Sequence, residues 1–178
     1  MEIVNPQQLA KEGQAEYQKG EYLSAARSFK AAADGFSSIG DQLAAAEMAN
    51  NSSVAYLKAG DGAAALEATH GTDLVFGSVG DVKRQAMALG NQASALEKLK
   101  RLDEALAMYE KSAELLKEAG ELELRAYVYQ SMSELLLHRG SYLEAYAAMR
   151  IGVMDIKNPN PSQRILQSLM EIPFKFLK

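Results

Sequence analysis

The chain has 178 residues, a formal net charge of −4 at pH 7 and no cysteine. This length suffices for one domain with a substantial core. The acidic balance argues against nucleic acid as a partner, because binding to phosphates needs clustered Lys and Arg. The lack of cysteine excludes disulfides and thiolate chemistry.

The beginning of the chain and its apolar runs bear on localisation. Met1 and Glu2 are followed by a mixed sequence, without the basic start and apolar run of a secretory signal. No apolar run approaches the roughly 18 residues of a membrane span. We therefore expect a soluble, cytoplasmic protein.

Helices are expected in pairs along most of the chain. The first begins after Asn5, a capping residue, with Pro6 at the first helical position. Apolar residues at helical spacing, separated by tight turns, predict an all-α fold with helices at 6–19 and 22–38, 41–59 and 62–77, 81–99 and 102–118, and 121–139 and 142–157.

A constant step of 40 in residue number relates these pairs. Alanines keep this step in the second helices, at Ala25, Ala65, Ala105 and Ala145. A helix-stopping glycine followed by an acidic residue keeps it too, at Gly40-Asp41, Gly80-Asp81 and Gly120-Glu121. The sequence thus predicts four helix-turn-helix repeats, at about 6–40, 41–80, 81–120 and 121–157. One pair cannot bury its own apolar face, so stability must come from stacking.

Small residues recur in one column of the first helices. This column contains Gly13, Ser53, Ala93 and Ser133. Small side chains let a second helix approach closely, so we expect this column to face the second helix of the same repeat.

The second helix of the second repeat, 62–77, contains poor helix formers. Gly62, Thr69, Gly71 and Thr72 all have lower helix propensity than their counterparts in the first and third repeats. One interpretation is a continuous helix held by its neighbours, and we favour it because tertiary context often overrides propensity. The other is a loosened or kinked segment around His70 and Gly71 that lets the repeats flex.

The repeat pattern stops at 158–163, NPNPSQ, which predicts a linker. A short helix is expected from Ser162, with Pro173 interrupting the end of the chain. The amphipathic segment 164–178 carries eight apolar residues, including Ile165, Leu169, Phe174 and Phe176, together with three basic residues. Residues 164–172 are interpreted as a cap over the last exposed face, whereas the final six residues are too apolar for the outer face of a cap.

The repeat resembles the tetratricopeptide repeat, whose second helix ends in A-x3-F/Y-x2-A. Ala25-Phe29-Ala32 matches this pattern fully and Ala105-Tyr109-Ser112 nearly, whereas Ala145-Met149-Gly152 and Ala65-Thr69-Thr72 match weakly. The long step is similar to that of kinesin light chain and Pins-type adaptors. The resemblance implies a right-handed α-solenoid over residues 1–157, followed by a C-terminal capping helix.

In this family the first helices line a concave groove that binds a peptide or helix of another protein. Carried over by column, the resemblance implies that the groove contains Lys11, Asn51, Asn91 and Ser131, with Gln14, Val54, Ser94 and Glu134 one turn further on. Close to these columns lie Asn50, Lys58, Lys98 and Gln130. Asn51 and Asn91 match asparagines that hydrogen-bond a bound peptide backbone, a task suited to an amide because it both donates and accepts. The other interpretation is that these are ordinary polar residues on a solvated face.

No catalytic, metal or phosphate-binding motif is found, and neither His70 nor His138 has a spaced partner of such a motif. We therefore expect a non-catalytic scaffold without cofactor or metal, whose partner is a protein or peptide. The alternative is an adaptor that attaches to a membrane surface or membrane complex, or self-associates, through contacts of Ile165, Leu169, Phe174 and Phe176 in its tail.

Overall fold

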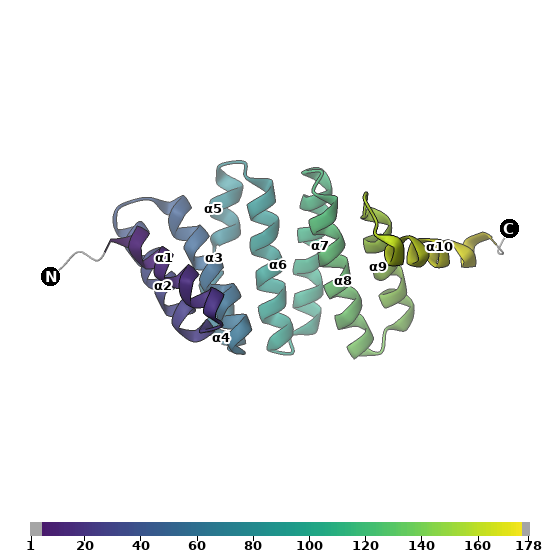
Figure 1. Cartoon of the computed structure of the whole chain (residues 1–178), viewed down its shortest axis with the longest axis horizontal. Helices are drawn as coiled ribbons and strands as arrows, with labels where there is room; N and C mark the ends of the chain where they lie inside the picture. Colours follow the sequence, from purple (N-terminus) through teal and green to yellow (C-terminus); the bar gives the residue numbers. More distant parts are fainter. Residues whose placement is uncertain (1–4, 176–178) are drawn as a thin grey trace. The chain divides into compact units, whose positions relative to one another are not determined.

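A computed structural model describes the backbone of residues 5–175 and the side chains of residues 5–171. All regular structure in this range is helical, which confirms the all-α prediction. The helices are α1 (Pro6–Lys19), α2 (Tyr22–Ser38), α3 (Gln42–Ala59), α4 (Gly62–Ala68), α5 (Thr72–Ser78), α6 (Val82–Lys98), α7 (Leu102–Glu118), α8 (Leu122–Arg139), α9 (Tyr142–Asp155) and α10 (Pro161–Lys175) (Figure 1).

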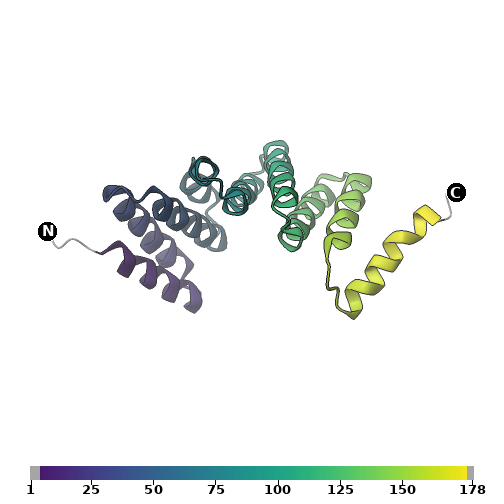
Figure 2. The ribbon, with the colours of Figure 1, turned by 90° about the horizontal axis from the view of Figure 1, so that it is seen from above.

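The chain divides into two compact units, and the division falls inside α7, between Met108 and Tyr109. In the first unit α2 packs against both α1 and α3, and α6 packs against α3, α4 and α5. In the second unit α9 packs against α8 and also contacts α10. After the end of α9 the chain turns, and α10 diverges from α9 (Figure 2). The division lies within the third predicted repeat rather than at a boundary between repeats.

The helices recur at the predicted step. Helices α2, α4, α7 and α9 begin at residues 22, 62, 102 and 142, and α3, α6 and α8 begin at 42, 82 and 122. The alanines of the repeating column are buried, with Ala25, Ala65 and Ala105 0% exposed and Ala145 1% exposed. The predicted period is therefore confirmed both in the helix boundaries and in this buried column.

Capping residues set the helix starts as predicted. The Asn5 side chain accepts a hydrogen bond of 2.9 Å from the backbone N–H two residues further on. Gly80 ends its helix with φ at 73°, a left-handed conformation in which glycine has no Cβ penalty. The following Asp81 caps α6, and Asp41 and Asp61 cap α3 and α4 in the same way.

The small residues of the first helices lie where helices pack closely. All four members of the column, Gly13, Ser53, Ala93 and Ser133, are buried. A Cβ at Gly13 would lie 2.9 Å from a ring carbon of Phe29 on α2. The Ser133 hydroxyl donates a hydrogen bond of 2.9 Å to the carbonyl of Ala145 on α9. The column therefore faces the second helix in the first and fourth repeats, as expected.

The favoured prediction of one continuous helix over 62–77 is wrong. Helix α4 ends at Ala68 and α5 starts at Thr72, with Gly71 between them at a left-handed φ of 74°. Side chains of other helices stabilise the break: the Gln92 amide donates to the Thr69 carbonyl at 3.0 Å, and the Thr72 hydroxyl lies 3.3 Å from the Asn50 side-chain oxygen. Weak helix formers together with these outside partners make the interruption the stable arrangement.

The C-terminal helix is longer than predicted at both ends. It begins at Pro161, inside the predicted 158–163 linker, because Asn160 and Gln163 cap it reciprocally, each side chain accepting from the other's backbone N–H at 2.9 and 2.8 Å. The helix also continues past Pro173 to Lys175, so the expected interruption is wrong. Proline removes the hydrogen bond of its own backbone N–H, and only two residues of the helix follow it.

Candidate functional site

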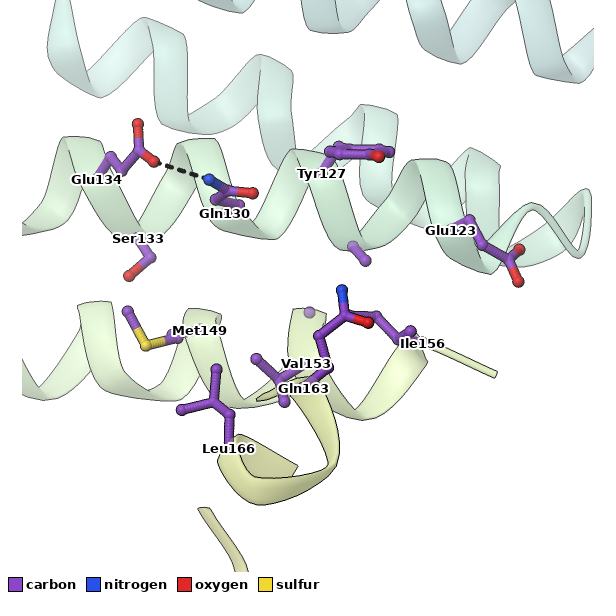
Figure 3. A pocket seen from close by; sticks show the side chains of 12 residues that line it. Glu123, Tyr127, Gln130, Ser133, Glu134, Met149, Val153, Ile156, Gln163 and Leu166 are labelled. Atoms are coloured by element: carbon purple, nitrogen blue, oxygen red, sulfur yellow. Dashed lines mark hydrogen bonds between the residues drawn. The ribbon is translucent and has the colours of Figure 1, made fainter. Parts of the chain in front are cut away.

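The second unit contains a pocket of about 430 Å³ between α8, α9 and the first turns of α10 (Figure 3). Most of its walls are apolar. They are built by Glu123, Ala126, Tyr127, Gln130, Ser133 and Glu134 of α8, by Met149, Gly152 and Val153 of α9 with Ile156 just after it, and by Gln163 and Leu166 of α10.

Four of the six α8 residues that line the pocket form one stripe along the helix. Glu123, Tyr127, Gln130 and Glu134 are spaced at i, i+4, i+7 and i+11, which places them on one face of the helix. The Tyr127 side chain is 68% exposed, so it offers a large apolar surface at the rim. The Gln130 amide donates to the Glu134 carboxylate at 3.1 Å, which orients both side chains (Figure 3).

The α9 wall depends on a close approach of two helices. A Cβ at Gly152 would lie 3.0 Å from the carbonyl oxygen of Ala126 and 3.0 Å from Cβ of Tyr129, both on α8. The contact is tight, so glycine is what lets α9 lie this close to α8. On this side of the pocket, Met149 and Val153 supply apolar surface (Figure 3).

Helix α10 is attached to α9 by polar contacts as well as by packing. The Gln167 amide donates to the Val153 carbonyl at 2.8 Å, and the Tyr146 hydroxyl lies 3.4 Å from the Met170 carbonyl. Met170 is only 7% exposed, whereas Leu166 lines the pocket. These contacts place the first turns of α10 as the third wall.

An ion pair beside the pocket joins α8 to α9. The Arg125 guanidinium donates to both oxygens of Asp155 at 3.0 and 2.9 Å, and each side chain is only 14% exposed. Burial raises the pKa of the Asp155 carboxyl above its ordinary value, and the charge and hydrogen bonds of Arg125 oppose this rise. The guanidinium also lies over the ring of Tyr129, 4.9 Å from its centre.

The pocket has an acidic rim. Glu123 and Glu134 are exposed, and they are the only charged side chains among the described residues that line it. The arrangement combines an apolar interior, an aromatic rim and a few polar groups, which is typical of ligand and peptide sites.

The residues predicted for the groove fall into both compact units. The first unit contains Lys11 and Gln14 on α1, Asn50, Asn51 and Lys58 on α3, and Asn91, Ser94 and Lys98 on α6; the second contains Gln130, Ser131 and Glu134 on α8. Gln130 and Glu134 line the pocket of the second unit, whereas Ser131 is half-buried and does not.

The asparagines of the first unit differ in accessibility. Asn50 is 9% exposed, and its side-chain oxygen faces the hydroxyl of Thr72 inside the protein. Asn51 and Asn91 are half-buried and so retain some accessible surface. A smaller pocket of about 190 Å³ between α2, α3 and α4 contains none of the predicted groove residues.

Only half of the apolar face of α10 is covered. Met170 is buried and Leu166 partly so, whereas Ile165 is 63% and Leu169 56% exposed. Of the other predicted tail contacts, Phe176 lies outside the described residues, and so does the side chain of Phe174.

Sequence reasoning missed most of the pocket. Tyr127 stands three and seven residues before the predicted Gln130 and Glu134, a spacing that places all three on one face of a helix. This stripe was therefore detectable in the sequence. The walls formed by Met149, Val153 and Leu166 had no such signal, because they depend on the angle at which α10 leaves α9.

The two histidines lie outside the pocket. His70 and His138 are both exposed, and the described part of the chain holds no cluster of three His, Asp or Glu side chains suited to a metal ion. None of the helices within residues 5–175 has the length and apolar character needed to cross a bilayer. No family model and no curated protein matches this chain.

Proposed function

We propose that the chain is a non-catalytic protein-interaction scaffold that binds a peptide or helix of a partner protein in the pocket of the second unit. The proposed architecture is a right-handed α-solenoid of four tetratricopeptide-like repeats with α10 as its cap. The recurrence of helix starts at a step of 40 in residue number and the buried alanine column support this architecture.

The observation that carries the proposal is the pocket beside α8, because Gln130 and Glu134, two of the predicted groove residues, line it. Its apolar interior suits an anchor side chain, and exposed Tyr127 beside it supplies the kind of aromatic surface that dominates binding energy at interfaces. Gln130 can donate to and accept from a peptide backbone. Asn51 and Asn91 remain predicted backbone contacts in the first unit.

Selection from a random peptide display library tests this function. The intact chain is expected to retain peptides whose binding weakens about tenfold on Tyr127→Ala, the effect of losing an interface aromatic. Tyr142→Ala is the matched control, because Tyr142 is 71% exposed on α9 and does not line the pocket. Peptides that bind both variants equally well, or the failure to select any peptide, would remove the pocket as the binding site.

A second candidate function rests on the exposed half of α10. Ile165 and Leu169 present an apolar edge of the kind that inserts into a membrane interface. In a vesicle sedimentation assay with anionic lipids, Ile165→Ser with Leu169→Ser should release the chain. An intact chain that does not bind vesicles rules this candidate out.

A further inference from the structure

The rim of the pocket carries charge of one sign at two fixed points. Glu123 and Glu134 stand at i and i+11, at the two ends of the α8 stripe, and both are exposed. A step of eleven makes about three helical turns, so the two positions lie about 16 Å apart on one face of the helix. Among residues 5–171 neither carboxylate forms an ion pair. Both charges are therefore available to a partner.

Between these two carboxylates the pocket is mainly apolar. Tyr127 is 68% exposed at the rim, and Met149, Val153 and Leu166 form the walls that face α8 (Figure 3). A segment that lies along α8 therefore meets apolar surface in its middle and a negative charge at each end. Charge complementarity favours a segment that is apolar in its middle and basic at both ends.

Much of the hydrogen-bonding capacity of the lining is already used within the chain. One amide hydrogen of Gln130 goes to Glu134, and the Ser133 hydroxyl donates to a carbonyl of α9. The side-chain oxygen of Gln163 accepts from a backbone N–H at the start of α10. An extended peptide needs partners for its buried backbone groups, whereas a helix satisfies these groups internally. The lining therefore suits a helical segment better than an extended one.

We propose that the pocket binds an amphipathic helix of a partner protein, with apolar residues along one stripe and Lys or Arg at both ends of that stripe. This inference rests on the proposed function, since it names the chemistry of the partner that the same pocket binds. A helix that lies along α8 places its basic residues opposite Glu123 and Glu134 when they too stand about eleven residues apart. Its apolar residues, one and two turns after the first basic residue, then pack on Tyr127 and the interior.

Selection from a display library of random peptides about 20 residues long, enough for three turns between two basic residues, tests the charge of the partner. Peptides retained by the intact chain should be at least about twofold richer in Lys and Arg than the unselected pool, and poorer in Asp and Glu. Retained peptides that show no such enrichment overturn the inference.

Neutral variants of the protein locate the charge effect. Fluorescence anisotropy of the retained peptides should show binding about fivefold weaker to Glu123→Gln with Glu134→Gln, because two exposed ion pairs are lost. Glu110→Gln with Glu144→Gln is the matched control, since it removes the same charge from exposed positions of α7 and α9 that do not line the pocket. Equal binding to the two double variants overturns the inference.

Glycine substitution in a retained peptide tests whether the partner is helical. Two residues that point away from its apolar stripe are changed to Ala in one version and to Gly in the other. These positions face solvent in the proposed complex, so the two versions differ mainly in helix propensity, and the Gly version should bind about tenfold more weakly. Equal binding of the two versions indicates an extended peptide and overturns the inference.

Failure of this inference can be told apart from failure of the proposed function. Retained peptides that depend on Tyr127, but neither on the two glutamates nor on helix propensity, refute the basic helix and leave the peptide site in place. Failure to retain any peptide removes the site together with its proposed partner.

Discussion

The ion pair between Arg125 and Asp155 gives the sharpest stability prediction. Replacing Arg125 with Met leaves a carboxylate that is only 14% exposed without its cation. Exposed pairs contribute about 0–1 kcal/mol and the loss of one partner of a buried pair costs about 3–5 kcal/mol. Because this pair is largely but not wholly buried, we expect Arg125→Met to lower the free energy of unfolding by about 2 kcal/mol at pH 7.

The cost of Arg125→Met should shrink as the pH falls. Burial already raises the pKa of Asp155, and Arg125 is what holds this rise down, so the variant raises it further. The folded variant therefore binds a proton at Asp155 at a higher pH than the unfolded chain does. As the pH falls from the raised folded pKa to the ordinary pKa of the unfolded chain, this proton binding stabilises the folded state. The protonated carboxyl no longer needs a cation, so the loss caused by Arg125→Met should be smaller at pH 4.5 than at pH 7, by up to about 1.4 kcal/mol for each unit by which the substitution raises the pKa of Asp155.

Urea unfolding at pH 7 and pH 4.5 measures both effects. The double variant Arg125→Met with Asp155→Leu should recover most of the loss at pH 7, because an apolar pair leaves no buried charge. Arg101→Met is the matched control: Arg101 and Glu104 are 2.7 Å apart, closer than the buried pair, but 47% and 57% exposed, so no measurable change is expected. An equal loss at both pH values, or a double variant as unstable as the single one, would refute the reasoning.

Two further stability predictions concern the first unit. Gly71→Ala should cost about 1 kcal/mol in urea unfolding because the residue adopts a φ of 74°; Gly77→Ala, where the new Cβ meets only the flexible end of Gln85, should not destabilise. Hydrogen bonds from the backbone N–H and side chain of Arg84 lower the pKa of Asp81. The stability that the Asp81 carboxylate contributes is therefore fully present above the ordinary pKa of 3.8, and it is lost as the pH falls through the lower pKa of the folded state. Asp81→Ala should therefore destabilise at pH 7 by about 1 kcal/mol, the usual effect of losing a cap, and much less near pH 2, and equal losses would contradict the assignment.

Local signals explain why the helices could be predicted from the sequence. Asn5 with Pro6 and glycines with a following aspartate are capping features that act over a few residues, and the structure places the helix starts at or next to these positions. The buried alanine column follows from the repeat period itself. These features depend on sequence neighbours, so one chain is enough to detect them.

The break between α4 and α5 depends on residues that are distant in sequence. Propensity identified Thr69 and Gly71 as weak points but did not decide between a held helix and an interruption. The deciding partners are Gln92 on α6 and Asn50 on α3, whose side chains meet the polar groups of the interruption. The same contact buries Asn50, which was predicted to lie close to the groove columns.

The candidate site was predicted only along α8, and the reason lies in how α10 begins. Helix α10 starts close to where a fifth first helix would start, since α3, α6 and α8 begin at 42, 82 and 122 and α10 at 161. In the small-residue column, however, it carries Pro173 in place of Gly13 or Ser133. Packing depends on such column residues, and α10 diverges from α9 instead of lying along it (Figure 2).

The space that remains between α8, α9 and this diverging helix is the pocket.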